Sequence, residues 1–157
     1  MNEKFMARAI ELSIESVKRG TGPFGACCVA NNKIISEGFN KVTDNKNPDP
    51  TAHAEITAIR DACKKLNNFS LKNVELYSSC EPCSMCLSAI MWSRIDKVYY
   101  VNTREDAKAI NFDDSHIYEE LKKHINERKI PMIQIKTMKE QAIKAFKMWS
   151  KSGNTKY

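Results

Sequence analysis

Two short stretches of the chain contain the residue types that bind metals and transfer protons. The first is His53-Ala54-Glu55, and the second is Cys80-Glu81-Pro82-Cys83-Ser84-Met85-Cys86. Each has an ordinary interpretation when it is taken alone. A single histidine at the start of a helix often caps the helix or packs in the core, and a Cys-x-x-Cys pair in a cytosolic protein can be redox-active.

Taken together, the two stretches predict a catalytic zinc site. Cys83 and Cys86 are three residues apart, so they share one face of a helix's first turn, where free N–H groups favour thiolates. If His53 opens a second helix that meets the first, one imidazole and two thiolates supply three ligands and leave a fourth position for water. Zinc lowers the pKa of such a water, and Glu55 is the candidate base for its proton.

The geometry of the first stretch imposes one condition on this interpretation. Residues two apart on a regular helix point to nearly opposite sides, so His53 and Glu55 converge only if the first turn is irregular or the histidine lies at the cap. Two other sites compete with the prediction. A structural zinc site needs a second Cys pair, which is missing beyond Cys86, and an iron–sulfur motif needs Cys and Pro where the chain has Ile90 and Met91.

The spacing of apolar residues predicts alternating helices and strands around this site. Helices are expected at 3–19, 52–66, 82–94, 115–126 and 140–150, and strands at 25–30, 33–38, 74–79, 97–101 and 131–136. This order predicts an α/β fold, a three-layer α/β/α sandwich with a five-stranded mixed sheet, in which the fourth and fifth strands run parallel. The length of 157 residues predicts one domain over 1–157.

Composition and charge narrow the class of protein. With 42% hydrophobic and 28% charged residues the chain is expected to be globular, and no stretch is long and apolar enough for a membrane helix. Charges spread through the first twenty residues argue against a signal peptide and for a cytoplasmic protein. The net charge of +6 is C-terminal, since residues 1–114 hold 15 basic and 15 acidic side chains. We interpret that excess as a solvated helix face, so nucleic acid is not the expected partner.

The two stretches resemble the H-x-E and P-C-x-x-C signature of the zinc-dependent cytidine and deoxycytidylate deaminase superfamily. Within it the chain most resembles the small bacterial guanine deaminases. Four further stretches carry that resemblance: Gly22-Pro23-Phe24-Gly25-Ala26, Glu37-Gly38-Phe39-Asn40, 111–118 and the terminal Tyr157. The resemblance implies a cytidine deaminase-like fold, one Zn²⁺ per chain, and a homodimer that exchanges C-terminal segments at about 139–157.

The resemblance also implies roles for individual residues. Asn40 would hydrogen-bond a purine base, Phe24 would pack on its ring, Asp114 would contact the amino group or relay protons, and Tyr157 would come from the partner's tail. Each residue has a simpler interpretation. Asn40 could be a turn residue, Phe24 could be core, Asp113 and Asp114 could cap the helix that follows, and Tyr157 could be a frayed terminus.

The implied reaction is the hydrolysis of guanine to xanthine and ammonia, in which Glu55 moves the protons. Asn111 and His116 depart from the residues usual in the family and lie near the expected substrate loop, so the base preference stays open. A tRNA adenosine deaminase is the nearest alternative, and cytosine and guanosine are other candidate substrates. A non-catalytic zinc-binding or RNA-binding module is the alternative from another class, and the presence of Glu55 argues against it.

Overall fold

The computed structural model describes residues 2–155 and contains one four-stranded sheet among them. Its order is β2-β1-β3-β4; β1 runs antiparallel to β2 and β3, while β3 and β4 are parallel. The strands are β1 (Gly25–Ala30), β2 (Lys33–Phe39), β3 (Glu75–Cys80) and β4 (Lys97–Asn102). The prediction of a mixed sheet is therefore confirmed.

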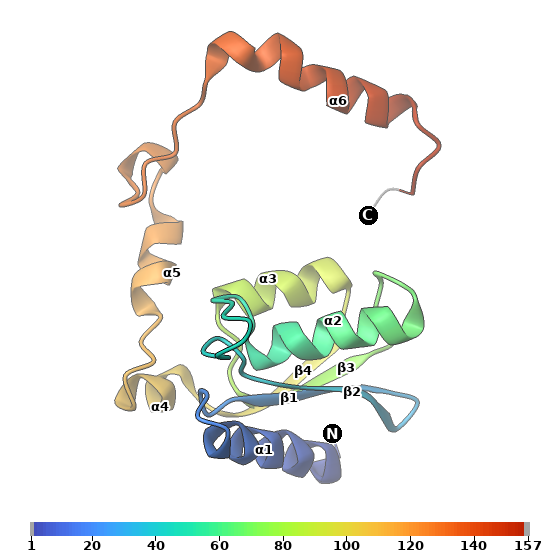
Figure 1. Cartoon of the computed structure of the whole chain (residues 1–157), viewed down its shortest axis with the longest axis vertical. Coiled ribbons are helices and arrows are strands. Elements are labelled where there is room, and N and C mark those ends of the chain that lie inside the picture. Colours follow the sequence, from blue (N-terminus) through green and yellow to red (C-terminus); the bar gives the residue numbers. More distant parts are fainter. Residues whose placement is uncertain (1, 156–157) are drawn as a thin grey trace. The chain divides into compact units, whose positions relative to one another are not determined.

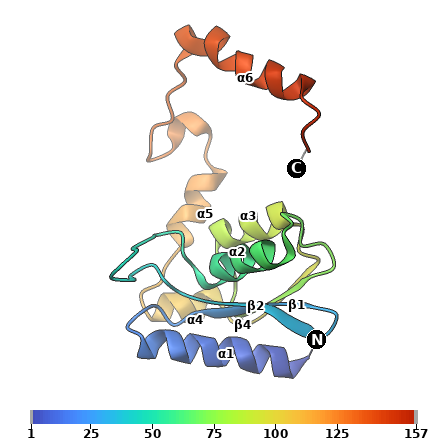
Figure 2. The ribbon, with the colours of Figure 1, turned by 45° about the vertical axis from the view of Figure 1, so that its right-hand side comes forward.

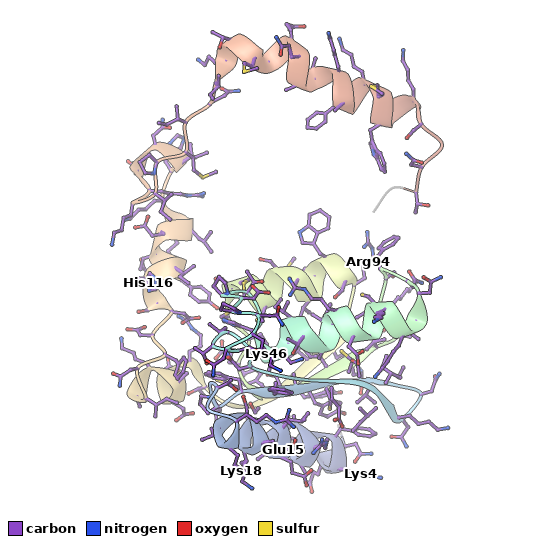
Figure 3. The ribbon with its side chains drawn as sticks, viewed as in Figure 1. Lys4, Glu15, Lys18, Lys46, Arg94 and His116 are labelled. Carbon is purple, nitrogen blue, oxygen red and sulfur yellow. The ribbon has the colours of Figure 1, made fainter. Side chains whose placement is uncertain are left out.

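Helices cover both faces of this sheet (Figures 1 and 2). α1 (Glu3–Lys18) lies on one face, and α2 (Ala54–Leu66) and α3 (Ser84–Ser93) lie on the other. α1 buries a stripe of residues at helical spacing, and Figure 3 shows Lys4 and Lys18 on the side that faces away from the sheet. The predicted three-layer α/β/α arrangement is confirmed.

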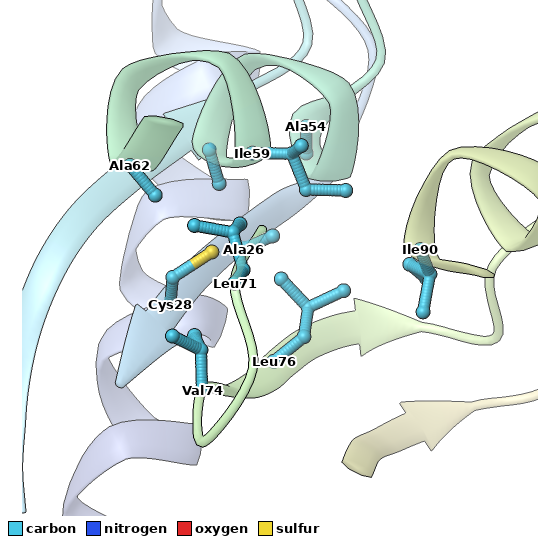
Figure 4. Packing of buried hydrophobic residues seen from close by; sticks show 10 residues of the cluster. Ala26, Cys28, Ala54, Ile59, Ala62, Leu71, Val74, Leu76 and Ile90 are labelled. Atoms are coloured by element: carbon cyan, nitrogen blue, oxygen red, sulfur yellow. The ribbon is translucent and has the colours of Figure 1, made fainter. Parts of the chain in front are cut away.

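The core between the sheet and α2 combines small side chains with larger aliphatic ones (Figure 4). Ala54, Ala58 and Ala62 are fully buried along one face of α2, and they bring the helix close to β1 and β2. The closest approach is at Gly38 of β2, where an added Cβ would lie 2.2 Å from the carbonyl oxygen of Ala54. The absence of a side chain at Gly38 thus seats the first turn of α2 against the sheet.

The sheet has four strands among residues 2–155, so the predicted fifth strand at 131–136 is wrong. The segment alternates apolar and polar residues as a strand does, but no sheet edge pairs with it, and Ile133 is 84% exposed. The predicted parallel pairing of the fourth and fifth strands is wrong with it. The observed parallel pair is β3 and β4, which α3 connects.

The chain divides into two compact units, residues 1–118 and 119–157. The first unit contains the sheet, the three helices and a short helix that the sequence did not predict, α4 (Arg104–Ala109). α5 (Ser115–Lys122) runs across the division. The second unit continues with the 3₁₀ turns Ile125–Glu127 and Lys136–Met138 and with α6 (Lys139–Lys151). None of residues 119–155 is buried. No helix within residues 2–155 combines the length and the apolar character that crossing a membrane requires.

We expect Gly38→Ala to lower the free energy of unfolding by about 1–3 kcal/mol, because the new methyl group overlaps the backbone of α2. Urea unfolding followed by circular dichroism measures the change. The matched control is Gly153→Ala, where nothing lies within 4 Å of the new Cβ. Equal unfolding midpoints for the two variants would contradict the close approach of β2 and α2.

Candidate active site

The metal-binding residue types gather at one edge of the sheet. β3 and β4 are parallel, so their carboxyl ends meet there, and the Glu81 N–H donates to the Asn102 carbonyl at 2.8 Å. The chain turns from this edge directly into α3, while α2 begins beside it. The starts of two helices therefore lie next to the ends of two strands.

His53 and Cys83 occupy equivalent positions on the two helices. Each is the N-cap, with extended backbone (ψ 160° and 172°) and without a hydrogen bond from its side chain to its own helix. Of the two conditions under which His53 and Glu55 could converge, an irregular first turn or a histidine at the cap, the structure meets the second. Pro82, which we expected at the first helical position, instead precedes the N-cap.

The imidazole and the two thiols converge closely. The Nδ1 atom of His53 lies 3.6 Å from the Sγ of Cys83 and 3.6 Å from the Sγ of Cys86, and all three ligand atoms are within 4.8 Å of one another. Nitrogen and sulfur ligands of a tetrahedral zinc are about 3.5–3.8 Å apart. The three residues thus fit a zinc ion in both ligand type and spacing.

The electrostatics of the cluster favour one thiolate before any metal binds. The hydrogen bond from the Cys86 thiol, together with the one from His53, lowers the pKa of Cys83 to about 4. The same bond to Cys83, followed by burial, raises the pKa of Cys86. Cys80 differs from both, because burial raises its pKa to about 11 and its thiol donates to the Thr103 carbonyl at 3.5 Å. Cys80 lies outside the group that fits a metal.

Glu55 lies beside this cluster and is almost fully buried, with 5% of its surface exposed. The Ser78 hydroxyl donates to Oε1 at 2.9 Å, and Oε2 lies 3.4 Å from the Sγ of Cys86. Burial raises the pKa of its carboxyl group. A buried carboxyl group oriented by a hydroxyl donor next to a metal-binding cluster is suited to taking up and releasing a proton.

A cavity of about 250 Å³ opens in front of Glu55 and the metal-binding residues. That volume is below the range of about 300–1,000 Å³ that is usual for drug-sized ligands, so the cavity suits a small molecule. Its lining combines apolar and polar residues from several loops: Gly22, Phe24, Asn40, Val42, Thr43, Pro50, His53, Glu55, Cys80, Glu81, Cys83, Arg104, Ala107, Phe112 and Asp114.

Asn40 and Phe24, which we expected to bind substrate, both line this cavity. Asn40 is 5% exposed, and its Oδ1 accepts the N–H of Val42 at 3.1 Å. The other end of the amide, Nδ2, lies against Gly22, where an added Cβ would approach it to 3.2 Å. Phe24 meets Phe112 edge to face, with ring centroids 5.0 Å apart. No residue among 2–155 accepts a hydrogen bond from the Asn40 Nδ2, so the amide has a donor group left for a ligand.

The two aspartates before α5 have different surroundings. Asp113 binds the N–H and hydroxyl of Ser115 through Oδ1, and so supports the start of α5. Asp114 lines the cavity and accepts from the Arg104 Nε at 3.2 Å. Asp113 therefore supports the helix start, while Asp114, for which capping and ligand contact were both open, faces the cavity. Tyr157 lies outside the described residues.

The sequence reasoning missed Arg104 and gave Phe112 no role of its own. Both depend on α4, which is only six residues long and so carries little apolar periodicity. A signal for this helix was nevertheless present, because Thr103 and Asp106 form a capping box in which each side chain binds the other residue's N–H. A Thr-x-x-Asp pattern directly after a strand was the sign of a helix at the site.

We expect Cys83→Ala to remove bound zinc, because two ligands hold the ion far less tightly than three. Purified protein should contain about one zinc per chain, and the variant close to none, by metal analysis. Cys80→Ala is the matched control, because Cys80 is a thiol at the same end of the sheet outside the metal-binding group and its loss should leave the zinc content unchanged. Zinc loss in both variants, or in neither, would contradict the ligand set.

The chain matches known proteins over its whole length. Residues 1–102 match the family described as the cytidine and deoxycytidylate deaminase zinc-binding region. The guanine deaminase of Bacillus subtilis is 47% identical over 99% of this chain and 97% of its own length. The tRNA-specific adenosine deaminase of Aquifex aeolicus is 43% identical, but over 62% of this chain and 64% of its own.

Solved structures agree with these relatives. The X-ray structure of guanine deaminase from Bacillus subtilis superposes on the chain with a TM-score of 0.92 and 46% identity, and the match covers 100% of this chain and 99% of the other. The zinc-binding description of the family agrees with the three residues that converge here. The chain therefore belongs to the cytidine and deoxycytidylate deaminase family of zinc-binding enzymes.

Proposed function

We propose that this protein is a guanine deaminase, which hydrolyses guanine to xanthine and ammonia. The observation that carries the proposal is the extent of the likeness to the Bacillus subtilis enzyme. It covers 99% of the chain and so continues past residue 102, where the family match ends, into the segment that supplies Arg104, Phe112 and Asp114 to the cavity. The likeness to the Aquifex aeolicus tRNA-specific enzyme spans only 98 residues.

In this proposal His53, Cys83 and Cys86 hold one zinc ion. A zinc ion with three protein ligands keeps a position for water and lowers the pKa of that water toward neutrality. Glu55 accepts a proton from the attacking water and returns it to the substrate, because its carboxyl group is the acid–base group beside the cluster. At C2 of guanine a C–O bond forms, and Glu55 delivers one proton of the water to a ring nitrogen and the other to the amino group. The C–N bond then breaks, ammonia leaves, and the oxygen becomes the C2 carbonyl of xanthine.

The cavity lining supports a flat, uncharged base as the ligand. Phe24 and Phe112 supply aromatic surface, against which a purine ring can pack. The free amide end of Asn40 donates a hydrogen bond to a ring nitrogen or carbonyl oxygen, and Asp114 accepts one from an N–H group of the base. The positive charge of Arg104 is offset by Asp114, which favours a neutral base over a phosphorylated nucleotide.

A panel of aminated compounds tests the proposal. We expect ammonia release with guanine, and none or far less with cytosine, guanosine and an adenosine-containing anticodon stem-loop, measured by coupled ammonia assay and by mass spectrometry for xanthine and inosine. The stem-loop is included because the zinc region also resembles tRNA-specific enzymes and the C-terminal segment is basic. Inosine in the RNA without xanthine formation would overturn the proposal.

Glu55→Gln serves as the control for this assay. The amide keeps the shape of the side chain but cannot carry the proton, so kcat should fall by at least about 10²–10⁴-fold while the zinc content is retained. Turnover of guanine at the wild-type rate in this variant would remove Glu55 from the mechanism and leave the substrate assignment standing.

We also propose that residues 1–157 form one functional domain in a homodimer, in which the segment at about 139–157 is exchanged between subunits. Exposed large apolar side chains in the second unit support the proposal that a second copy of the chain packs against it. They are exposed among residues 119–155, and they include Ile130, Ile133, Ile135, Phe146 and Met148. Tyr157 would then reach the partner's cavity.

The cysteines are free thiols, which supports a reducing compartment, the cytoplasm.

Complementation between two inactive variants tests the exchange. A chain that lacks residues 151–157 should lose activity, and Glu55→Gln should lose it for a different reason. In a mixed dimer the intact tail of the Glu55→Gln chain would close the cavity of the truncated chain, so refolding the two together should restore about a quarter of the wild-type rate for random pairing. No recovery on mixing, with dimers present by light scattering, would contradict the exchange.

A further inference from the structure

Arg104 is a charged cavity-lining residue to which neither the metal nor the proton transfer gives a role. It is the first residue of α4, directly after the sheet edge that holds the metal-binding loop. Its backbone is fixed on both sides: the Thr103 carbonyl accepts the Cys80 thiol, and the Thr103 hydroxyl accepts the Asp106 N–H at 3.2 Å. The backbone at Arg104 is therefore held to the same end of the sheet that carries the metal-binding cysteines.

The guanidinium group is held from two directions. Its Nε donates to Oδ1 of Asp114 at 3.2 Å, and its central carbon lies 3.7 Å from the centre of the Tyr118 ring. A planar guanidinium that stacks on an aromatic ring while it binds a carboxylate has little freedom to rotate. Arg104 and Asp114 have side-chain exposures of 29% and 23%, so the pair is partly shielded from water.

The two oxygens of the Asp114 carboxylate have different surroundings. Oδ1 is bound to Arg104, whereas Oδ2 has no hydrogen-bond partner among residues 2–155. Asp114 lines the cavity, so its second oxygen is the one available to a ligand. A carboxylate fixed through one oxygen presents the other at a defined place, as a group that orients a substrate must.

We propose that Arg104 is a positioning residue for the deamination reaction. It acts through Asp114, which it orients and whose charge it balances in a cavity that already contains Glu55. The proposal rests on the proposed function, because it takes an aminated base as the ligand that Asp114 receives. Arg104 itself does not touch the reacting atoms.

A neighbouring ion pair provides a matched control. Lys108 is on the same helix as Arg104, and Asp113 directly precedes Asp114. The Nζ of Lys108 lies 3.3 Å from Oδ2 of Asp113, and the two side chains are 62% and 42% exposed. Neither member of this pair lines the cavity. If an ion pair between α4 and the loop were needed only for stability, the two pairs would respond alike to substitution.

The test is a double-mutant cycle on guanine turnover. Arg104→Gln should lower kcat by about 10–100-fold while KM changes by less than about 3-fold, because a displaced Asp114 affects the reaction more than the binding. Lys108→Gln should stay within about 2-fold of wild type. Asp114→Asn should be slow by itself, and adding Arg104→Gln to it should cause no further loss, since Arg104 then has no carboxylate to position.

Zinc content and the urea unfolding midpoint are measured for every variant. If Arg104→Gln fails to fold, Arg104→Lys replaces it in the cycle; the lysine keeps the charge but lacks the planar group, and the same coupling is expected. Wild-type kcat in a folded Arg104 variant, or full additivity with Asp114→Asn, would overturn the positioning role alone. A wild-type protein that releases no ammonia from guanine would overturn the proposed function, and the positioning role with it.

Discussion

The site depends on one constraint, that two helices begin at the carboxyl ends of a parallel strand pair with their cap side chains 3.6 Å apart. The N-cap residues of α2 and α3 have extended rather than helical backbone, so helical spacing does not fix the direction of their side chains. These two residues are the metal-binding His53 and Cys83. Because neither side chain caps its helix, each is free to bind the ion. The first helical turns then bring Cys86 and Glu55 to the same place.

Backbone packing and hydrogen bonds, rather than metal binding, hold the starts of α2 and α3 in place. Fully buried alanines and Gly38 let α2 lie close against β1 and β2, so the height of its first turn above the sheet is set by backbone contact. On the other side, the hydrogen bond between Glu81 and Asn102 joins the loop after β3 to the end of β4. Close packing of this kind tolerates little displacement of the backbone, so the positions of the metal-binding side chains are well defined.

The sequence predicted the parts of the structure that follow from local patterns. Apolar periodicity predicted the helices that became α1 and α2, and helices were also predicted where α3, α5 and α6 lie. The two metal-binding stretches were recognised from residue type and spacing. The fifth strand failed because alternation shows that a segment can form a strand, while a sheet edge decides whether it does. Arg104 was missed because its partner, Asp114, is ten residues away across a turn that no periodic pattern describes.

The distribution of burial also bears on how the protein is made. Every buried side chain among residues 2–155 lies between Phe5 and Ser93, so the hydrophobic interior is complete before the last third of the chain has been translated. The nascent polypeptide can therefore close its interior and assemble the imidazole–thiol cluster while the later segment is still attached to the ribosome. Apolar side chains of that later segment, such as Ile133, emerge onto a chain that already has its core.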